Sequence, residues 1–172
     1  SRHSGADSRQ GQVVRSAGFG EVFRIVFRNV NFLTSFVSAP AYAILSDVLN
    51  NDSSPPGILV HLIGNSVGKA ALEGINATTE FSGDSLLAMA NVISALALTE
   101  EGIGLVKSDN PFDHLFSIFH EAKYVYPESH VLMPDVPGMF GNQIEELLRH
   151  QPDLSGLCLT AVVNELNNVC LL

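Results

Sequence analysis

The hydrophobic positions of the chain recur at helical spacing. Between residues 86 and 97 they follow the i, i+3, i+4, i+7 rhythm that places side chains on one face of a helix. These positions are Leu86, Met89, Ala90, Ile93, Leu96 and Ala97. No run alternates strictly between apolar and polar residues over more than a few positions, as a half-buried strand would. The pattern therefore predicts an all-α fold.

The same periodicity, with turn formers between the periodic runs, predicts the remaining helices. Pro40 interrupts one of them, which predicts a kink or a division into two shorter helices. The expected helices cover residues 21–28, 34–49, 58–63, 67–72, 99–106 and 111–119, then a stretch from near Met139 to Arg149, and a last one after the turn at 151–153.

Two helix starts carry capping signals. Thr99 precedes Glu100 and Glu101, a capping residue followed by acids that favour the positive end of the helix dipole. Asn110 is expected to cap the next helix, with Pro111 as its first residue.

Several apolar stripes are expected to face the core. Beside one of them, Glu145 and Arg149 are spaced for an i, i+4 ion pair on the solvent side. The stripes comprise Val22, Ile25 and Val26 with the adjoining Phe23 and Phe27; Phe36, Tyr42, Leu45, Val48 and Leu49; Phe112, Leu115, Phe116 and Phe119; Phe140, Ile144, Leu147 and Leu148; and Leu159, Val162, Val163, Leu166, Val169 and Cys170.

The domain organisation follows from length and from these elements. The chain is long enough for one domain with a core and short for two. We expect a flexible or irregular N-terminal arm over residues 1–19 and an armadillo-like helical repeat domain over residues 20–172, with irregular loops at about 50–57, 75–83 and 121–138. Helices of about 8 to 17 residues joined by short turns are typical of an armadillo/HEAT-like α-solenoid fragment. Because no clean internal repeat is present, a compact helical bundle is the alternative.

The amino-acid composition indicates which classes of binding partner to expect for the chain. Hydrophobic residues make up 46% and charged residues 16% of the chain, which suggests that part of its apolar surface is covered by neighbouring solenoid segments. A net charge of −9 argues against direct nucleic-acid binding.

No apolar run has the length of a membrane span, and no signal-peptide pattern opens the chain. Two cysteines, Cys158 and Cys170, twelve residues apart on one predicted helix, fit a reducing, intracellular compartment.

No residue set predicts catalysis, cofactor binding or metal binding. Ser16–Val22 resembles the glycine-rich loop of protein kinases, but no strand lysine, catalytic-loop Asp or metal-binding Asp motif follows. His114 and His120 are six residues apart and fall on nearly opposite helix faces. The other histidines stand alone, and two thiols make no zinc site. We expect both cysteines to be small core residues.

Four segments of the second half resemble one family. They are Asn91–Leu98 (NVISALAL), Gly102–Val106 (GIGLV), Asn110–Phe116 (NPFDHLF) and Glu145–Pro152 (EELLRHQP). Together they resemble the armadillo-like N-terminal region of the giant HECT-type E3 ubiquitin ligases of the Mule class and their fungal relatives. The catalytic cysteine of those ligases belongs to a separate C-terminal domain that nothing in this chain resembles.

The resemblance implies a non-catalytic scaffold that recruits clients and presents them to that catalytic domain, in the nucleus and cytoplasm. The fragment itself is then no enzyme, although the parent protein would be a ubiquitin transferase. An acidic surface suits basic protein clients, such as histones or ribosomal proteins. The alternatives are an armadillo-type binding adaptor unrelated to ubiquitin transfer, and a small helical hydrolase, for which the sequence offers no pocket of titrating groups.

Overall fold

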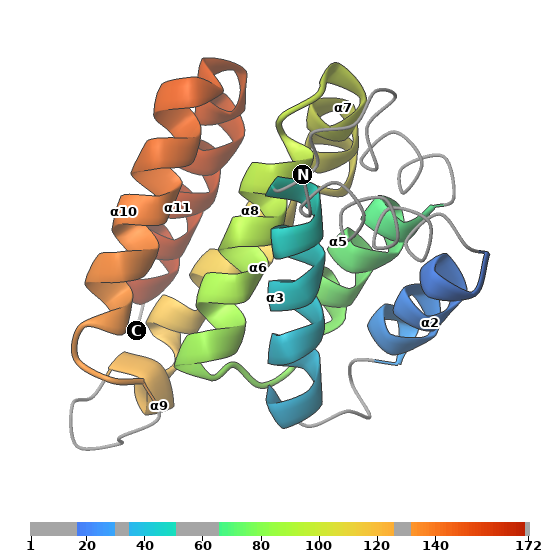
Figure 1. Ribbon diagram of the computed structural model, residues 1–172. Coiled ribbons are helices and arrows are strands. Elements are labelled where there is room, and N and C mark those ends of the chain that lie inside the picture. The colour runs from blue at the N-terminus through green and yellow to red at the C-terminus, as the bar shows by residue number, and fades with distance from the viewer. Residues whose placement is uncertain (1–16, 30–34, 51–65, 126–131, 171–172) are drawn as a thin grey trace, which may run out of the picture.

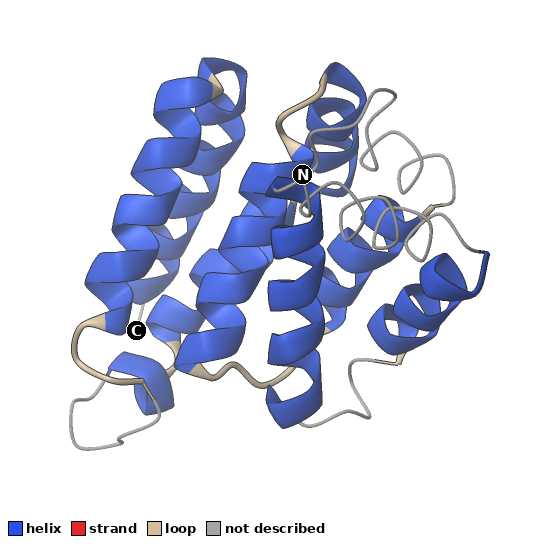
Figure 2. Ribbon diagram, viewed as in Figure 1, coloured by secondary structure: helices blue, strands red, loops and turns tan. Residues whose placement is uncertain are grey.

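The computed structural model describes residues 17–29, 35–50, 66–125 and 132–170, and every regular element in these ranges is helical (Figure 2). The all-α prediction is confirmed. The elements are α2 (Ala17–Arg28), α3 (Ser35–Asn50), α5 (Val67–Ala77), α6 (Gly83–Leu96), α7 (Glu100–Asp109), α8 (Pro111–Phe116), η2 (Ser117–His120), α9 (Ala122–Val125), α10 (Val136–His150), η4 (Pro152–Leu154) and α11 (Ser155–Cys170).

The helices stack in two layers (Figure 1). One layer holds α3, α6 and α10 side by side, and the other holds α2, α5, α8 and α11. The chain moves from the second layer to the first between α2 and α3, between α5 and α6, and between α8 and α10. Each helix packs mainly on its neighbours within the stack, as in an α-solenoid fragment.

Small residues on α5 let it approach α2 and α3 closely. Ala70, Ala71 and Gly74 are all buried in this contact. The fully buried Tyr42 of α3 donates a hydrogen bond from its hydroxyl to the carbonyl oxygen of Ala71 at 3.3 Å. Its ring stacks on Phe27 of α2 with 4.7 Å between ring centroids. The three helices therefore share one tightly packed corner of the core.

The capping predictions are confirmed in one case and corrected in the other. The Thr99 hydroxyl accepts a hydrogen bond from the Gly102 amide at 3.1 Å, as an N-cap does. Pro111 is the first residue of α8, but Asn110 before it has φ 39° and makes no side-chain cap. Its side-chain amide donates instead to the Asp113 carboxylate at 2.7 Å. Asn110 ends α7 in the left-handed conformation, which a short polar side chain tolerates.

Pro40 does not divide its helix. α3 runs unbroken from Ser35 to Asn50 with Pro40 inside it. Ala39 and Tyr42, on either side of the proline, are buried against the neighbouring helices. This packing offsets the missing amide hydrogen bond, so the helix continues.

Two predicted loops are shorter in the structure. α5 continues to Ala77 and α6 begins at Gly83, so residues 78–82 form the connection. Gly74 lies inside this helix, where its backbone closely approaches Tyr42 and Phe27. Within the stretch 121–138, α9 occupies Ala122–Val125 and α10 begins at Val136. Pro137 lies in the first turn of α10, where a proline favours a helix start.

The first stripe was assigned to the wrong side. Val22 and Ile25 are 59% and 54% exposed, whereas Phe23 and Phe27 are buried. Val26 is partly buried. Apolar residues cover most of this helix. Because aromatic side chains bury more area than valine or isoleucine, the face that carries them packs against the core.

The prediction that the apolar stripe of the last helix, α11, is buried was also wrong. Leu159 and Leu166 are 61% and 58% exposed, and Cys170 is exposed too. The buried face of α11 consists of Cys158 and Ala161, continuing from Leu154 in η4. Helical periodicity alone could not say which side of a widely apolar helix would find neighbours.

The stripes of α3, α8 and α10 are confirmed for their described side chains. The predicted pair of Glu145 with Arg149 is wrong, because Arg149 pairs with Glu146 one turn away. The i, i+3 spacing brings these two side chains together just as well. Buried residues of these stripes are Tyr42, Leu45, Leu49, Phe112, Leu115, Phe140, Ile144 and Leu147. The expected helix at 58–63, most of the turn at 50–57 and most of the N-terminal arm lie outside the described residues.

Candidate functional site

The two cysteines show no sign of catalytic activation. Both are free thiols on α11. Burial raises the pKa of the Cys158 thiol to about 11, so it stays protonated at neutral pH. Cys170 is exposed, and no histidine of the described residues is hydrogen-bonded to it. Cys158 is the small core residue that the sequence predicted.

His114 has a structural task. Its Nε2 lies 2.6 Å from the Thr78 carbonyl oxygen, which can only accept, so the imidazole donates this hydrogen bond. Its ring also packs against Phe81, with 5.5 Å between centroids. The Phe81 amide donates to the Tyr124 hydroxyl at 2.9 Å. Together, α8 and α9 hold the connection between α5 and α6 in place.

The other described histidines are paired within the fold, and the described part of the glycine-rich segment is helical. His120 pairs with Glu165 of α11, and His150 with Glu146 one turn away. Residues 17–22 lie in α2, so they cannot form the strand–turn–strand that covers nucleotide phosphates. Within the described ranges no three His, Cys, Asp or Glu side chains gather where they could hold a metal ion. In the same ranges, no helix has both the length and the apolar character to cross a bilayer.

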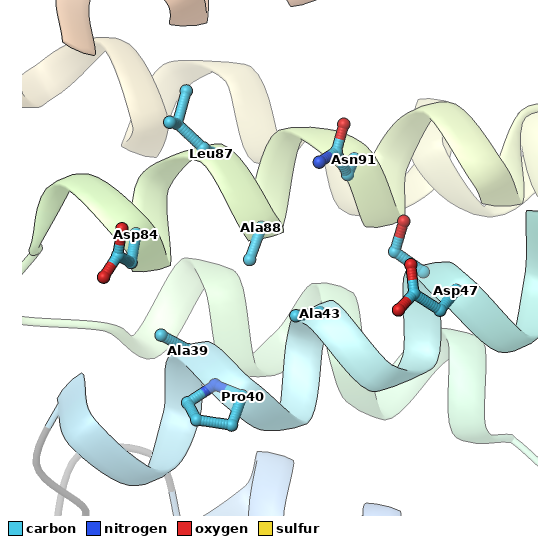
Figure 3. A pocket seen from close by; sticks show the side chains of 9 residues that line it. Ala39, Pro40, Ala43, Asp47, Asp84, Leu87, Ala88 and Asn91 are labelled. Atoms are coloured by element: carbon cyan, nitrogen blue, oxygen red, sulfur yellow. The ribbon is translucent and has the colours of Figure 1, made fainter.

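The site with the clearest geometry is a groove between α3 and α6, open to solvent, of about 410 Å³. The two helices run parallel, so that residues 39–47 of one face residues 84–91 of the other (Figure 3). Asp84 lies at one end of the groove, and Asp47 and Asn91 lie toward the other. The lining consists of Ala39, Pro40, Ala43, Ser46, Asp47, Asp84, Leu87, Ala88 and Asn91.

Small side chains make this groove. Ala39, Ala43 and Ala88 leave space between two helices that otherwise pack along their whole length. Among the residues that the structure describes, neither lysine nor arginine lines the groove, and its lining includes the carboxylates of Asp47 and Asp84. Asp84 sits in the first turn of α6, at the positive end of the helix dipole. The groove is therefore apolar along its floor and negative at its ends.

The groove residues were not among the candidate site residues predicted from the sequence. Ala39 and Ala43 are spaced i, i+4 on α3, a signal of one helix face with small side chains. That signal does not tell which helix lies opposite, because Ala88 is 45 positions further along the chain. By contrast, the described histidines make hydrogen bonds or ion pairs within the fold, and the two cysteines are free thiols.

Comparison with known proteins identifies the family and the relatives of the chain. Residues 3–172 match the family described as Domain of Unknown Function (DUF913). The chain is 25% identical over 152 residues, 88% of its length, to the E3 ubiquitin-protein ligase UPL2 of Arabidopsis thaliana. It is 28% identical over 111 residues (64% of the chain) to E3 ubiquitin-protein ligase ptr1 of Schizosaccharomyces pombe, and 30% identical over 103 residues (58%) to E3 ubiquitin-protein ligase HUWE1 of Mus musculus.

The chain spans only 4%, 3% and 2% of the length of these three relatives. No solved structure shows significant similarity to the chain. The relatives confirm the resemblance to the giant HECT-type ligases that the four sequence segments indicated. With nearly its whole length matched, the chain belongs to the DUF913 family, which it shares with segments of very large E3 ubiquitin-protein ligases.

Proposed function

We propose that the chain is a non-catalytic segment of a HECT-type E3 ubiquitin ligase that recruits basic protein clients. Its relatives among the E3 ubiquitin-protein ligases support the ligase context. Its buried, protonated Cys158 and isolated Cys170 support a role outside the chemistry of transfer. The observation that carries client recruitment is the groove between α3 and α6, apolar between two negative ends.

The groove suits an extended segment with two cationic side chains. The aliphatic stem of Lys or Arg packs on small apolar residues such as Ala43 and Ala88, while its charged head reaches a carboxylate. Seven residues of α6 separate Asp84 from Asn91, a rise of about 10 Å. A segment in the polyproline II conformation covers that distance in about three residues, and its three residues per turn bring every third side chain to the same side. Cationic residues three apart can therefore reach Asp84 at one end and Asp47 at the other.

The charge of the whole chain acts in the same direction. Eighteen acidic residues against nine basic ones attract positively charged segments and speed their encounter with the groove. The same charge repels phosphate backbones, so a histone-like or ribosomal protein is a better client than a free nucleic acid.

A direct test measures the binding of a fluorescent peptide with lysines three residues apart to the purified 172-residue chain, by anisotropy at low and at physiological salt. We expect binding that weakens as salt rises and that falls about tenfold or more in the Asp47→Asn, Asp84→Asn double variant. The matched control is Glu100→Gln, Glu101→Gln, which removes the same net charge from an exposed turn of α7. Equal weakening by both double variants would reduce the effect to net charge and overturn the groove as the site.

A second experiment tests the non-catalytic role. In the full-length natural polypeptide, Cys158→Ser, Cys170→Ser should leave ubiquitin transfer unchanged once the amount of folded protein is matched. Loss of the ubiquitin thioester in that double variant, with melting curve and abundance retained, would place a cysteine of this segment in the chemistry and contradict the proposal.

A further inference from the structure

Apolar side chains stand exposed next to the groove on its α3 side. Val37 is 44% exposed and Ile44 is 51% exposed, and Pro40, between them in sequence, is exposed and lines the groove (Figure 3). α6 contributes none of the large hydrophobic side chains that are exposed in the described ranges. The exposed apolar border of the groove therefore lies on α3, and we call Val37, Pro40 and Ile44 the α3 ridge.

Helix geometry places the α3 ridge directly beside the groove. At 100° per residue, the three ridge residues and Asp47 fall within about 80° of arc around α3. Pro40 and Asp47 line the groove, so Ile44, which is about one turn from each of them, stands at its edge. Val37 and Ile44 are separated by a rise of about 10 Å, which equals the spacing of the two negative ends of the groove. The ridge therefore runs beside most of the groove.

The exposed side of α3 has few charges for a surface helix. Asp47 is the one charged residue within Ser35–Asn50. A helix side that faces only water carries mostly charged and polar residues. Exposed apolar side chains grouped beside a groove with charged ends are typical of a binding surface, where the apolar part contributes contact area and the charges orient the partner. We therefore expect the α3 ridge to contact the same partner as the groove.

A client segment in the polyproline II conformation brings one side chain to the α3 ridge. Its three residues per turn point in three directions, so when two cationic residues three apart face the groove, the two residues between them point elsewhere. One of these points toward α3 and the other toward α6. A large apolar side chain at the position that points toward α3 buries area on Pro40 and Ile44, whereas a charged side chain there would lose water without gaining a partner.

We propose that the α3 ridge selects clients in which a large apolar residue stands between the two cationic residues that the groove binds. The carboxylates of Asp47 and Asp84 attract any basic chain, so charge alone does not discriminate among basic segments. The ridge supplies this discrimination, because a uniformly basic segment such as polylysine has no apolar side chain to cover it. This inference rests on the proposed function, since it names the class of client that the groove takes.

Two fluorescent peptides that differ in one residue, Lys-Leu-Pro-Lys and Lys-Ser-Pro-Lys within identical flanks, test the selection. We expect the leucine peptide to bind the chain about fivefold or more tightly than the serine peptide, because leucine buries apolar area on the ridge. This preference should disappear in Val37→Ser, Ile44→Ser. The matched control is Val22→Ser, Ile25→Ser, which removes the same two kinds of exposed side chain from α2 and should keep the preference. Melting curves check that both double variants fold.

The outcomes separate the α3 ridge from the groove itself. If both peptides bind equally, and both weaken in Asp47→Asn, Asp84→Asn, the groove takes basic clients but the ridge does not select them. If neither peptide depends on the two carboxylates, the proposed function fails together with the selection. Loss of the preference in the α2 control as well would show a general effect of lost apolar surface and overturn the ridge. If the ridge variant instead abolishes a dimer in sedimentation while the preference persists, a second copy covers the ridge and the client does not.

Discussion

The backbone of Gly74 in α5 lies directly against the hydroxyl of Tyr42 in α3. A Cβ atom at residue 74 would stand 2.7 Å from that oxygen and 2.9 Å from the carbonyl oxygen of Phe27. The second contact is to backbone and cannot rotate away. Gly74→Ala should therefore force α5 away from both helices and lower the free energy of unfolding by about 1–3 kcal/mol.

Urea denaturation of the 172-residue chain measures this effect. Gly141→Ala in α10 is the matched control, since nothing lies within 4 Å of its Cβ position. It should raise the free energy of unfolding by up to about 1 kcal/mol, because alanine favours the helix. If both variants shift the urea midpoint in the same direction, this result would contradict the close approach of α5 to α3.

The hydrogen bond between His114 and Thr78 predicts a second stability effect. His114→Ala leaves the carbonyl of buried Thr78 without its donor, which should cost about 1–3 kcal/mol. His150 is exposed and pairs only with Glu146 on its own helix, so His150→Ala should change stability by about 0.5 kcal/mol or less. Thermal melts of the two variants provide the comparison, and equal melting temperatures would contradict a supporting role for His114.

The same substitution should have unequal effects at Leu154 of η4 and at Leu159 of α11, because only the first side chain is buried. Leu154 is fully buried and Leu159 is 61% exposed. Leu154→Ala should lower the free energy of unfolding by about 2–5 kcal/mol through loss of burial and a cavity. Leu159→Ala should stay within about 0.5 kcal/mol of wild type in the 172-residue chain. A large loss for Leu159→Ala would show that α11 packs on its other side.

Alkaline pH should destabilise the fold through Cys158 and Tyr42. Burial raises the pKa of Cys158 from 9.0 to about 11, and it raises the pKa of Tyr42 above its ordinary value of 10.0. Above pH 9 the unfolded chain releases these protons while the folded chain retains them, so stability falls as pH rises toward 11. Below about pH 8 neither group contributes a slope, because both stay protonated in the unfolded chain as well. The urea midpoint measured from pH 8 to 11 should decline less steeply in Cys158→Ala, Tyr42→Phe; an unchanged slope would contradict this assignment.

How far the sequence predicts the fold depends on what each pattern encodes. Periodicity identified most helices, and Thr99 and Pro111 marked two starts, because caps act within one turn. Which face of a helix is buried depends on neighbours distant in sequence, so the stripes of α2 and α11 were assigned wrongly. Gly74 lies inside α5 although glycine is a weak helix former, because its contact with Tyr42 of another helix leaves no room for a Cβ atom, and periodicity does not show such a contact.

The candidate site also combines features that a local sequence pattern encodes with features that depend on residues distant in sequence. The segments that carry the family resemblance could be read directly from the chain, and the comparisons confirm them. The groove could not, because it arises from Ala43 and Ala88, far apart in sequence, meeting across parallel helices. Net charge indicated basic partners without indicating a place for them.

The most direct test of client recruitment through the groove is a titration of the ¹⁵N-labelled 172-residue chain with the lysine-containing peptide, followed by NMR. The account predicts that the largest chemical-shift changes occur at the amides of Ala43, Asp47, Ala88 and Asn91, on both walls of the groove. Those changes should vanish in the Asp47→Asn, Asp84→Asn variant. Shifts concentrated on α10 and α11, or no saturable shifts at all, would contradict the α3–α6 groove as the client site.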